Sequence, residues 1–166
     1  MGLIIKNKIQ QLMRGYPTIS DKYDVAPAVL EGAGIVTAGA PVTLGSTAGR
    51  YKASTLMTDT VAGFVLATNV KVPDTYPAST ELQTYGEGEA FNLMIRGFIA
   101  CPLDSGATTA EMVNGKQVAL MAGGKLTTAD KATGDSATAT VIPDAYFTGC
   151  TETVNGEVLA EISFRL

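Results

Sequence analysis

Two glutamates two residues apart are the feature of this sequence that most resembles a chemical site. Glu87 and Glu89 alternate with Gly86 and Gly88 at the start of "GEGEAFNLMIRGFIAC", residues 86–101. Residues two apart in an extended chain point to the same side, so both carboxylates could approach a hard cation such as Ca²⁺. A calcium loop normally supplies more oxygen ligands, whereas glycines permit a sharp entry into a strand. We therefore favour a polar strand entrance over a metal site.

Other kinds of catalytic site lack the residues they need. The chain contains no histidine, which excludes Ser-His-Asp and Cys-His arrangements and zinc sites built on imidazole. The Gly-x-Gly sequence precedes a strand-like run instead of opening a helix, so it does not fit a dinucleotide-binding loop. Cys101 and Cys150 each end an apolar run, and we expect both to be reduced thiols in the core. We expect neither an enzyme nor a cofactor.

Charge is unevenly distributed along the chain. The formal net charge is −4, and Lys6, Lys8 and Arg14 give +3 to a segment without acids before Asp21, so the remainder carries −4 − 3 = −7. The negative total argues against nucleic-acid binding, which depends on clustered Lys and Arg. A basic terminus of this kind is typical of an arm that docks on an acidic surface, or of a frayed end.

The N-terminal residues also bear on localisation. "MGLIIKNKIQQLM" lacks the apolar core and cleavage motif of a signal peptide, and the chain has no run of about 20 apolar residues to span a bilayer. We expect synthesis in a cytoplasm and no membrane partner. Gly15 and Pro17 interrupt any helix here, so residues 1–20 are interpreted as an arm.

The rest of the chain has the texture of a β protein. Short apolar runs rich in β-branched residues are cut by Gly and Pro every eight to twelve positions. This pattern predicts a single domain over residues 21–166 that is mainly β, with the form of a sandwich, a jelly roll or a small barrel. Asn114-Gly115 and Asn155-Gly156 each lie between strand-like runs and predict type I′ hairpins.

Two strands have clear alternation. In the last strand, one set of alternate residues is apolar and is expected to face the core: Val158, Ala160, Ile162, Phe164 and Leu166. In the strand that follows Glu89, Phe91, Leu93 and Ile95 alternate with Asn92, Met94 and Arg96. Met94 and Arg96 would lie on the second face, either as part of a subunit contact or with the arginine at the wet end of a strand.

Several segments together resemble the head decoration, or capsid cement, proteins of tailed bacteriophages. "AGFVLATNVKV" is followed by "YGEGEAFNLMIRGFIAC" and then by "PLDSGATTAEMVNGKQVALMAGGKLTT". The family's pattern has a "GFVL"-like strand, a "G-E-x-h-x-h-h-x-R-G-h-h" strand (h, apolar), a "G-x-x-V" strand and a closing "G-E-V-x-h-E-I" strand. The matching positions are Gly63 to Leu66, Gly88 to Ile99, Gly115 to Val118 and Gly156 to Ile162.

The resemblance implies a non-enzymatic virion protein on the capsid exterior. Such proteins clamp neighbouring major capsid proteins, assemble as trimers or dimers, and often extend an N-terminal arm over the shell. On this basis we expect Met94 and Arg96 on an oligomer face and the following residues as arm contacts: Leu3, Ile4, Ile5, Lys6 and Lys8. The alternatives are a tail or fibre-base domain, and a β-sandwich module that binds sugar or calcium through Glu87 and Glu89.

Overall fold

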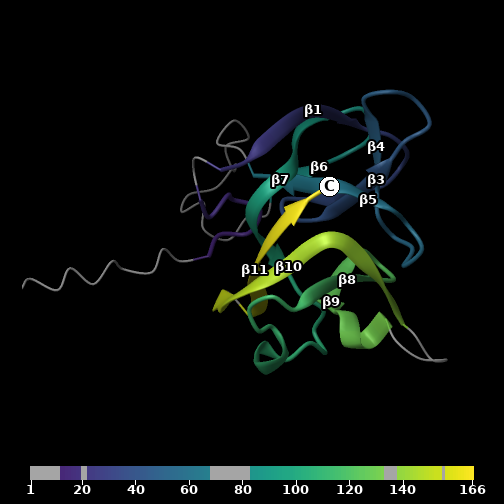
Figure 1. Ribbon diagram of the computed structural model, residues 1–166. Coiled ribbons are helices and arrows are strands. Elements are labelled where there is room, and N and C mark those ends of the chain that lie inside the picture. Colours follow the sequence, from purple (N-terminus) through teal and green to yellow (C-terminus); the bar gives the residue numbers. More distant parts are fainter. Residues whose placement is uncertain (1–11, 20–21, 68–82, 133–137, 155) are drawn as a thin grey trace, which may run out of the picture.

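The computed structural model describes residues 12–19, 22–67, 83–132, 138–154 and 156–166. The protein is mainly β, as its sequence predicts, and its elements are shown in Figure 1. In chain order they are β1 (Asp24–Leu30), β2 (Val36–Thr37), β3 (Pro41–Leu44), β4 (Arg50–Ala53), β5 (Val61–Leu66), β6 (Thr84–Tyr85), β7 (Ala90–Pro102), the 3₁₀ helix η2 (Thr109–Glu111), β8 (Gln117–Met121), β9 (Lys125–Thr128), the 3₁₀ helix η3 (Ala129–Ala132), β10 (Ala139–Val154) and β11 (Glu157–Arg165).

Five strands close into a small barrel. The sheet runs in the order β1-β4-β3-β5-β7, and β1 pairs with β7 as well, which completes the ring. Ala28 of β1 lies opposite Phe91 on one edge of β7, while Val65 of β5 lies opposite Leu93 on the other edge. The barrel occupies the upper part of Figure 1. The small-barrel form among those predicted from the sequence is therefore confirmed.

Strand β7 continues beyond the barrel and becomes part of a second layer. Arg96 lies opposite Asp24 of β1 on one side and opposite Arg165 of β11 on the other, so β11 follows β5 along the same edge of β7. The sheet then continues through β10 and β8 to β9, which returns to the end of β7 through a bridge between Leu103 and Leu126. One long strand thus belongs to both lobes.

Two hydrophobic cores correspond to the two lobes. The barrel encloses Ala28, Leu30, Val36, Val42, Val65, Tyr85, Phe91 and Leu93. The larger core contains Val61, Phe64, Leu66, Met94, Ile99, Cys101, Leu103, Met112, Val118, Leu120, Leu126, Ile142, Ala145, Phe147, Ala160, Ile162 and Phe164. Because successive side chains of a strand point to opposite faces, β5 and β7 supply residues to both cores and are covered on both faces.

The burial of β7 corrects the prediction for Met94. Its side chain is fully buried in the larger core with Phe64, whereas Phe91 and Leu93 fill the barrel. The sequence indicated a second face open to a partner, but the lobe formed by β8 to β11 covers that face. Met94 therefore cannot be part of an oligomer face in this fold. Arg96, at the point where the barrel ends, is exposed.

The N-terminal segment, residues 12–19, lies alongside β7. Gly15 donates its backbone N–H to the carbonyl of Ala100 at 2.8 Å, and Thr18 donates its backbone N–H to the carbonyl of Phe98 at 3.1 Å. These bonds continue the edge of β7 beyond the point where β1 ends, so the segment belongs to the folded domain. Residues 12–19 of the predicted arm are therefore part of the folded domain, and an arm formed by the residues before Leu12, which lie outside the described residues, stays a prediction.

One of the two predicted hairpins is present as expected. Val154 of β10 lies opposite Glu157 of β11, which confirms the second hairpin. Its type I′ turn stays a prediction, because Asn155 is outside the described residues. The Asn114-Gly115 prediction is wrong. The turn joins η2 to β8, and Gly115 has a φ of 82° while Asn114 does not have a positive φ, so the turn is not type I′.

The alternation predicted for the last strand is largely confirmed. Ala160, Ile162 and Phe164 of β11 are buried in the larger core. Leu166 follows the end of the strand and is 37% exposed. Leu159 lies on the other face of β11 and is nevertheless buried, because Leu12 of the N-terminal segment packs over it.

Candidate functional site

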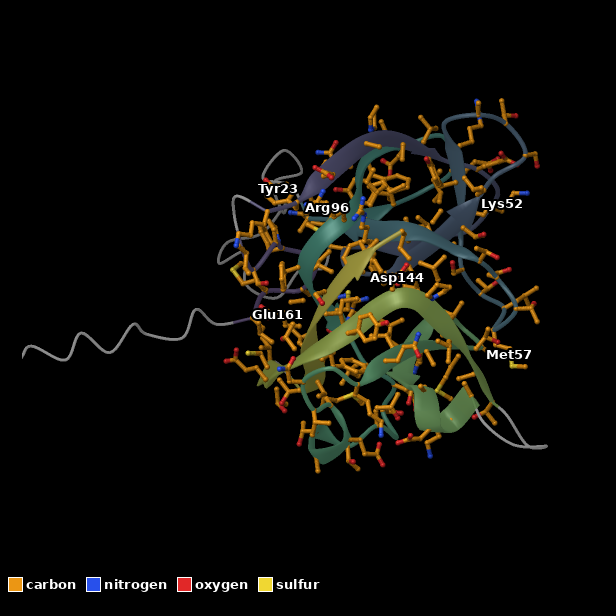
Figure 2. The ribbon with its side chains drawn as sticks, in the orientation of Figure 1. Tyr23, Lys52, Met57, Arg96, Asp144 and Glu161 are labelled. Carbon is orange, nitrogen blue, oxygen red and sulfur yellow. The ribbon has the colours of Figure 1, made fainter. Side chains whose placement is uncertain are left out.

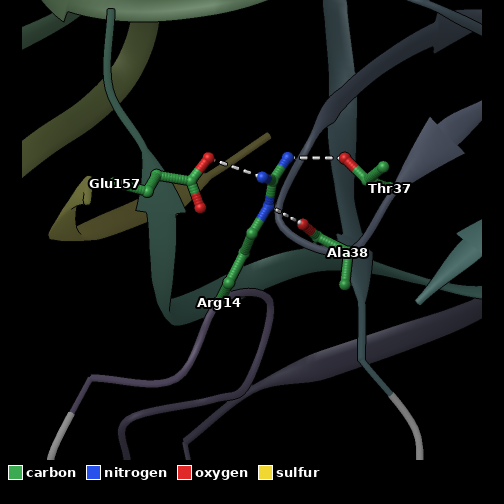
Figure 3. Close-up of polar contacts among 4 residues, drawn as sticks. All are labelled: Arg14, Thr37, Ala38 and Glu157. Atoms are coloured by element: carbon green, nitrogen blue, oxygen red, sulfur yellow. Dashed lines mark hydrogen bonds and ion pairs between the residues drawn. The ribbon is translucent and has the colours of Figure 1, made fainter. Parts of the chain in front are cut away.

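Arg14, near the start of the described residues, connects its segment to both lobes. Its Nη1 donates to Oε1 of Glu157 at 2.6 Å, its Nη2 to Oγ1 of Thr37 at 2.5 Å, and its Nε to the carbonyl of Ala38 at 2.8 Å. Glu157 begins β11, while Thr37 and Ala38 lie beside the barrel, so one guanidinium group bridges the two lobes (Figure 3). A planar, permanently charged group with several donors is well suited to such a junction.

Residues on either side of Arg14 strengthen this attachment. The backbone N–H of Leu12 donates to Oε2 of Glu152 at 2.7 Å, and the Leu12 side chain packs against Ala100 and Leu159. Gly15 has a φ of 74°, and a Cβ atom there would lie 2.6 Å from the Cβ of Ala38, so only glycine fits. We call residues 12–18 with these contacts the arm anchor.

A second feature is a shallow groove beside Arg96, with a volume of about 430 Å³. Arg96 forms a long ion pair with Asp24, its Nη1 lying 3.5 Å from Oδ2 of Asp24. Gly97 has a φ of 141° and packs closely under Tyr23. A Cβ atom on this glycine would lie only 2.6 Å from the Cβ of Tyr23. The backbone of Lys22 and Tyr23 therefore approaches Gly97 closely. Tyr23 and Arg96 lie near each other in Figure 2, on the side of the molecule opposite Lys52.

The groove lies on the outer face of the sheet formed by β7, β11 and β10. Phe98, Ser163 and Tyr146 are directly opposite one another across these strands and therefore share a face. The lower part of this face is covered where Leu12 packs on Ala100 and Leu159, and the part at the groove is open. Large apolar side chains near it are partly exposed: Tyr23 37%, Val25 39%, Tyr146 40% and Leu166 37%.

Glu87 and Glu89 form the entrance to β7. Oε2 of Glu89 accepts a hydrogen bond from the backbone N–H of Gly86 at 2.6 Å, and the strand begins at Ala90. Glu87 lies in this turn and is exposed. The strand-entrance interpretation is thus confirmed. Within the described parts of the chain, no group of three or more Cys, Asp or Glu side chains is arranged to hold a metal ion.

The two cysteines differ in their environments. Cys101 is buried in the larger core, and this burial raises the pKa of its thiol well above the ordinary value. Cys150 is exposed on β10, which corrects the expectation that both thiols lie in the core. Both cysteines are free. The apolar run before Cys150 indicated burial, but β10 alternates there and places this residue on the solvent side.

The site residues expected from the sequence have different outcomes. Leu3, Ile4, Ile5, Lys6 and Lys8 lie outside the described residues, so their role as arm contacts stays a prediction. The arm anchor was missed, because nothing in the sequence links Arg14 to Glu157, which is 143 positions away. No helix in the described part of the chain is long and apolar enough to cross a membrane.

Comparisons with known proteins agree with this architecture. The family described as structural cement protein (E217 gp24/Pam3 gp6) matches residues 7–165. A chain from the structure "The capsid of Myoviridae Phage XM1" has a similar fold, with a TM-score of 0.65 and 14% sequence identity over 99% of this chain and 97% of that chain. A search of curated proteins finds no match. Since the family match covers nearly the whole sequence, the chain belongs to the structural cement protein family of bacteriophages.

Proposed function

We propose that this protein binds the outer surface of a phage capsid and stabilises the capsid by clamping neighbouring major capsid proteins. Membership of the structural cement protein family supports a structural, capsid-stabilising role in the virion. The proposal adds the exterior location, the major capsid protein as partner and self-association as a trimer or dimer. The charged fraction of only 17% also suits a protein that stays packed against partners.

The observation that carries the proposal is the arm anchor. A basic segment of residues 1–11 is attached to a rigid body through Leu12, Arg14 and Gly15. An arm whose root is fixed can bind one capsid subunit while the body binds the next. Because both contacts belong to one molecule, the second binding event is intramolecular. Two contacts that are each weak can then together give tight binding to the capsid. Many copies on one shell would add these contributions.

The arm is tested by a deletion that leaves the anchor intact. Removal of residues 1–11 is expected to lower the affinity for capsids that lack cement protein by about tenfold or more, because one of two linked contacts is lost. The double variant K6A/K8A isolates the electrostatic contribution of the arm to capsid affinity. A triple variant with Ser in place of Leu3, Ile4 and Ile5 isolates the apolar contribution. Lys131→Ala on η3, an exposed lysine far along the chain, is the matched control.

Binding is measured by co-sedimentation of the purified variants with capsids, and stabilisation by the temperature at which the capsids release DNA. Unchanged binding by the deletion variant would refute the arm contacts, and failure of the full-length protein to bind capsids at all would refute the proposed function. Light scattering after size exclusion gives the oligomeric state. Arg96→Ala tests the prediction that this arginine lies on the oligomer face: loss of the trimer or dimer would support it, and an unchanged oligomer would leave Arg96 free to contact another partner.

A further inference from the structure

The open groove on the outer face of β7, β11 and β10 has a charge that differs from that of the whole molecule. Lys22, Arg96 and Arg165 line it together with Asp24 and Asp144, which gives +3 − 2 = +1 in a chain whose net charge is −4. A locally positive groove in an acidic protein is an electrostatically distinct surface.

Among the described residues, two of the cations in the groove have no acidic partner, and Asp144 in the same groove has no basic partner. Arg96 is paired with Asp24 at 3.5 Å, but neither Lys22 nor Arg165 forms an ion pair with any of the described residues. By contrast, Arg14, Lys52, Lys116 and Lys125 are each paired with a carboxylate. Lys22 and Arg165 are exposed and are therefore available to a ligand from outside.

Apolar surface lies directly beside these charges. Phe98 is half-buried and Tyr23, which packs on Gly97, is 37% exposed, and both line the groove. The third aromatic residue there, Phe164, is buried. Partly exposed aromatic side chains next to arginines are the composition that protein–protein contacts favour, and they fit an extended peptide better than a small ion. The groove is shallow, which also suits a segment of a larger partner.

We infer that this groove is a second docking site for the capsid, and that it takes an acidic segment of the major capsid protein with carboxylates against Lys22 and Arg165. The inference rests on the proposed function and adds the chemistry of the partner. A second copy of this chain is a poorer occupant. Two identical grooves brought together would each carry the same net charge of +1 and would repel each other, whereas an acidic segment is attracted. The basic arm of this chain, with Lys6 and Lys8, is disfavoured for the same reason.

The partner can be identified by zero-length coupling of amines to carboxylates with a carbodiimide. Capsids decorated with the full-length protein are treated with the reagent, and the products are located by mass spectrometry. Lys22 is expected to couple to an Asp or Glu of the major capsid protein. Coupling of Lys22 to another copy of this chain, or no coupling of Lys22 to the capsid protein, would overturn the inference. Lys22→Arg removes the primary amine that the coupling requires and is expected to abolish the product.

Charge reversal tests the energetic contribution of the groove. Arg165→Glu is expected to weaken capsid binding about tenfold and to reduce its dependence on salt, and Arg165→Lys, which keeps the charge, is expected to weaken binding less. Lys131→Glu makes the same change of charge away from the groove and is expected to alter binding less than about twofold. Circular dichroism shows whether each variant is folded.

The outcomes separate this inference from the proposed function. If deletion of residues 1–11 weakens binding and Arg165→Glu does not, the groove is not a docking site although the arm is. If the full-length protein binds no capsid, the proposed function itself fails. If Arg165→Glu dissociates the oligomer in solution without capsids, the groove is an interface between copies and the inference is wrong.

Discussion

Arg14 and Glu157 form an ion pair of 2.6 Å between the N-terminal segment and the start of β11, and their side chains are 15% and 36% exposed. Arg14→Ala removes this pair together with the bonds to Thr37 and Ala38, which leaves polar groups without partners at a half-buried junction. We expect a loss of about 2 kcal/mol in the free energy of unfolding, since hydrogen bonds to charged groups contribute most when water is partly excluded.

Urea unfolding of Arg14→Ala, Glu157→Gln and the double variant measures the coupling within this pair, which is expected to be about 1 kcal/mol. Lys125→Ala is the control, because its ion pair with Asp104 is 3.9 Å long and more exposed, and should cost less than about 0.5 kcal/mol. Equal losses for Arg14→Ala and Lys125→Ala would show that the Arg14 junction adds no stability.

Replacement of Gly15 by alanine is expected to destabilise the arm anchor. The backbone at Gly15 has a φ of 74°, and the added Cβ would lie 2.6 Å from that of Ala38. Gly49 has a φ of 76° with no atom within 4 Å of the position of its Cβ, so Gly49→Ala bears only the conformational cost. Gly15→Ala should therefore lose about 2 kcal/mol more than Gly49→Ala in urea unfolding, because it adds steric overlap. Similar losses in the two variants would contradict the close packing.

Glu31 is expected to make stability depend on pH in the acid range. Hydrogen bonds from the side chain and backbone of Ser46, with a further contribution from Lys52, lower the pKa of Glu31 from 4.5 to about 2. A lowered pKa in the folded state stabilises the protein above pH 4.5, and this stabilisation is lost as the pH falls toward 2.

Glu31→Gln should therefore be less stable than the unchanged protein at pH 7, and the difference should disappear near pH 2. Urea unfolding at several pH values measures this difference, and NMR titration of the Glu31 carboxyl group measures its pKa directly. A difference in stability that does not change between pH 7 and pH 2 would refute the assignment.

The cysteines should react at very different rates. Cys150 is exposed, whereas Cys101 is buried and has a raised pKa, so its reactive thiolate is scarce. In the native protein we expect a maleimide to label Cys150 alone, and in urea to label both residues. Mass spectrometry of tryptic peptides distinguishes the two sites, with Cys150→Ser as the control. Rapid labelling of Cys101 in the native protein would contradict its burial.

The sequence predicted the β class and the final hairpin because those features depend on local patterns. Alternation along β11 and the short loop before Glu157 are signals within a few residues of each other. It did not predict the burial of Met94, which depends on how two lobes stack on one strand. A period of two identifies two faces of a strand, but it does not say whether the second face meets solvent or another layer.

The candidate site was less accessible to sequence reasoning. From the sequence, Arg14 is only one of three cations in a basic N-terminal segment. Its partners Thr37, Ala38 and Glu157 are brought together by tertiary folding and have no local sequence signal. Arg96 was identified through its position in β7, but Lys22 and Arg165, which share its groove, come from opposite ends of the chain. Only the closed barrel and the β11 pairing place these cations side by side.

The pairing of residues 15–18 with β7 also determines how the protein carries a mechanical load. The segment runs antiparallel to residues 98–100, and its backbone bonds from Gly15, Thr18 and Ala100 lie across the direction of the chain. A force that pulls the N-terminal segment along that direction loads these hydrogen bonds and the Arg14 contacts in shear. In this geometry they must break at the same time, whereas a force across the strands would break them one after another. For the capsid-bound arm proposed above, this geometry would resist detachment more strongly than a peeling geometry.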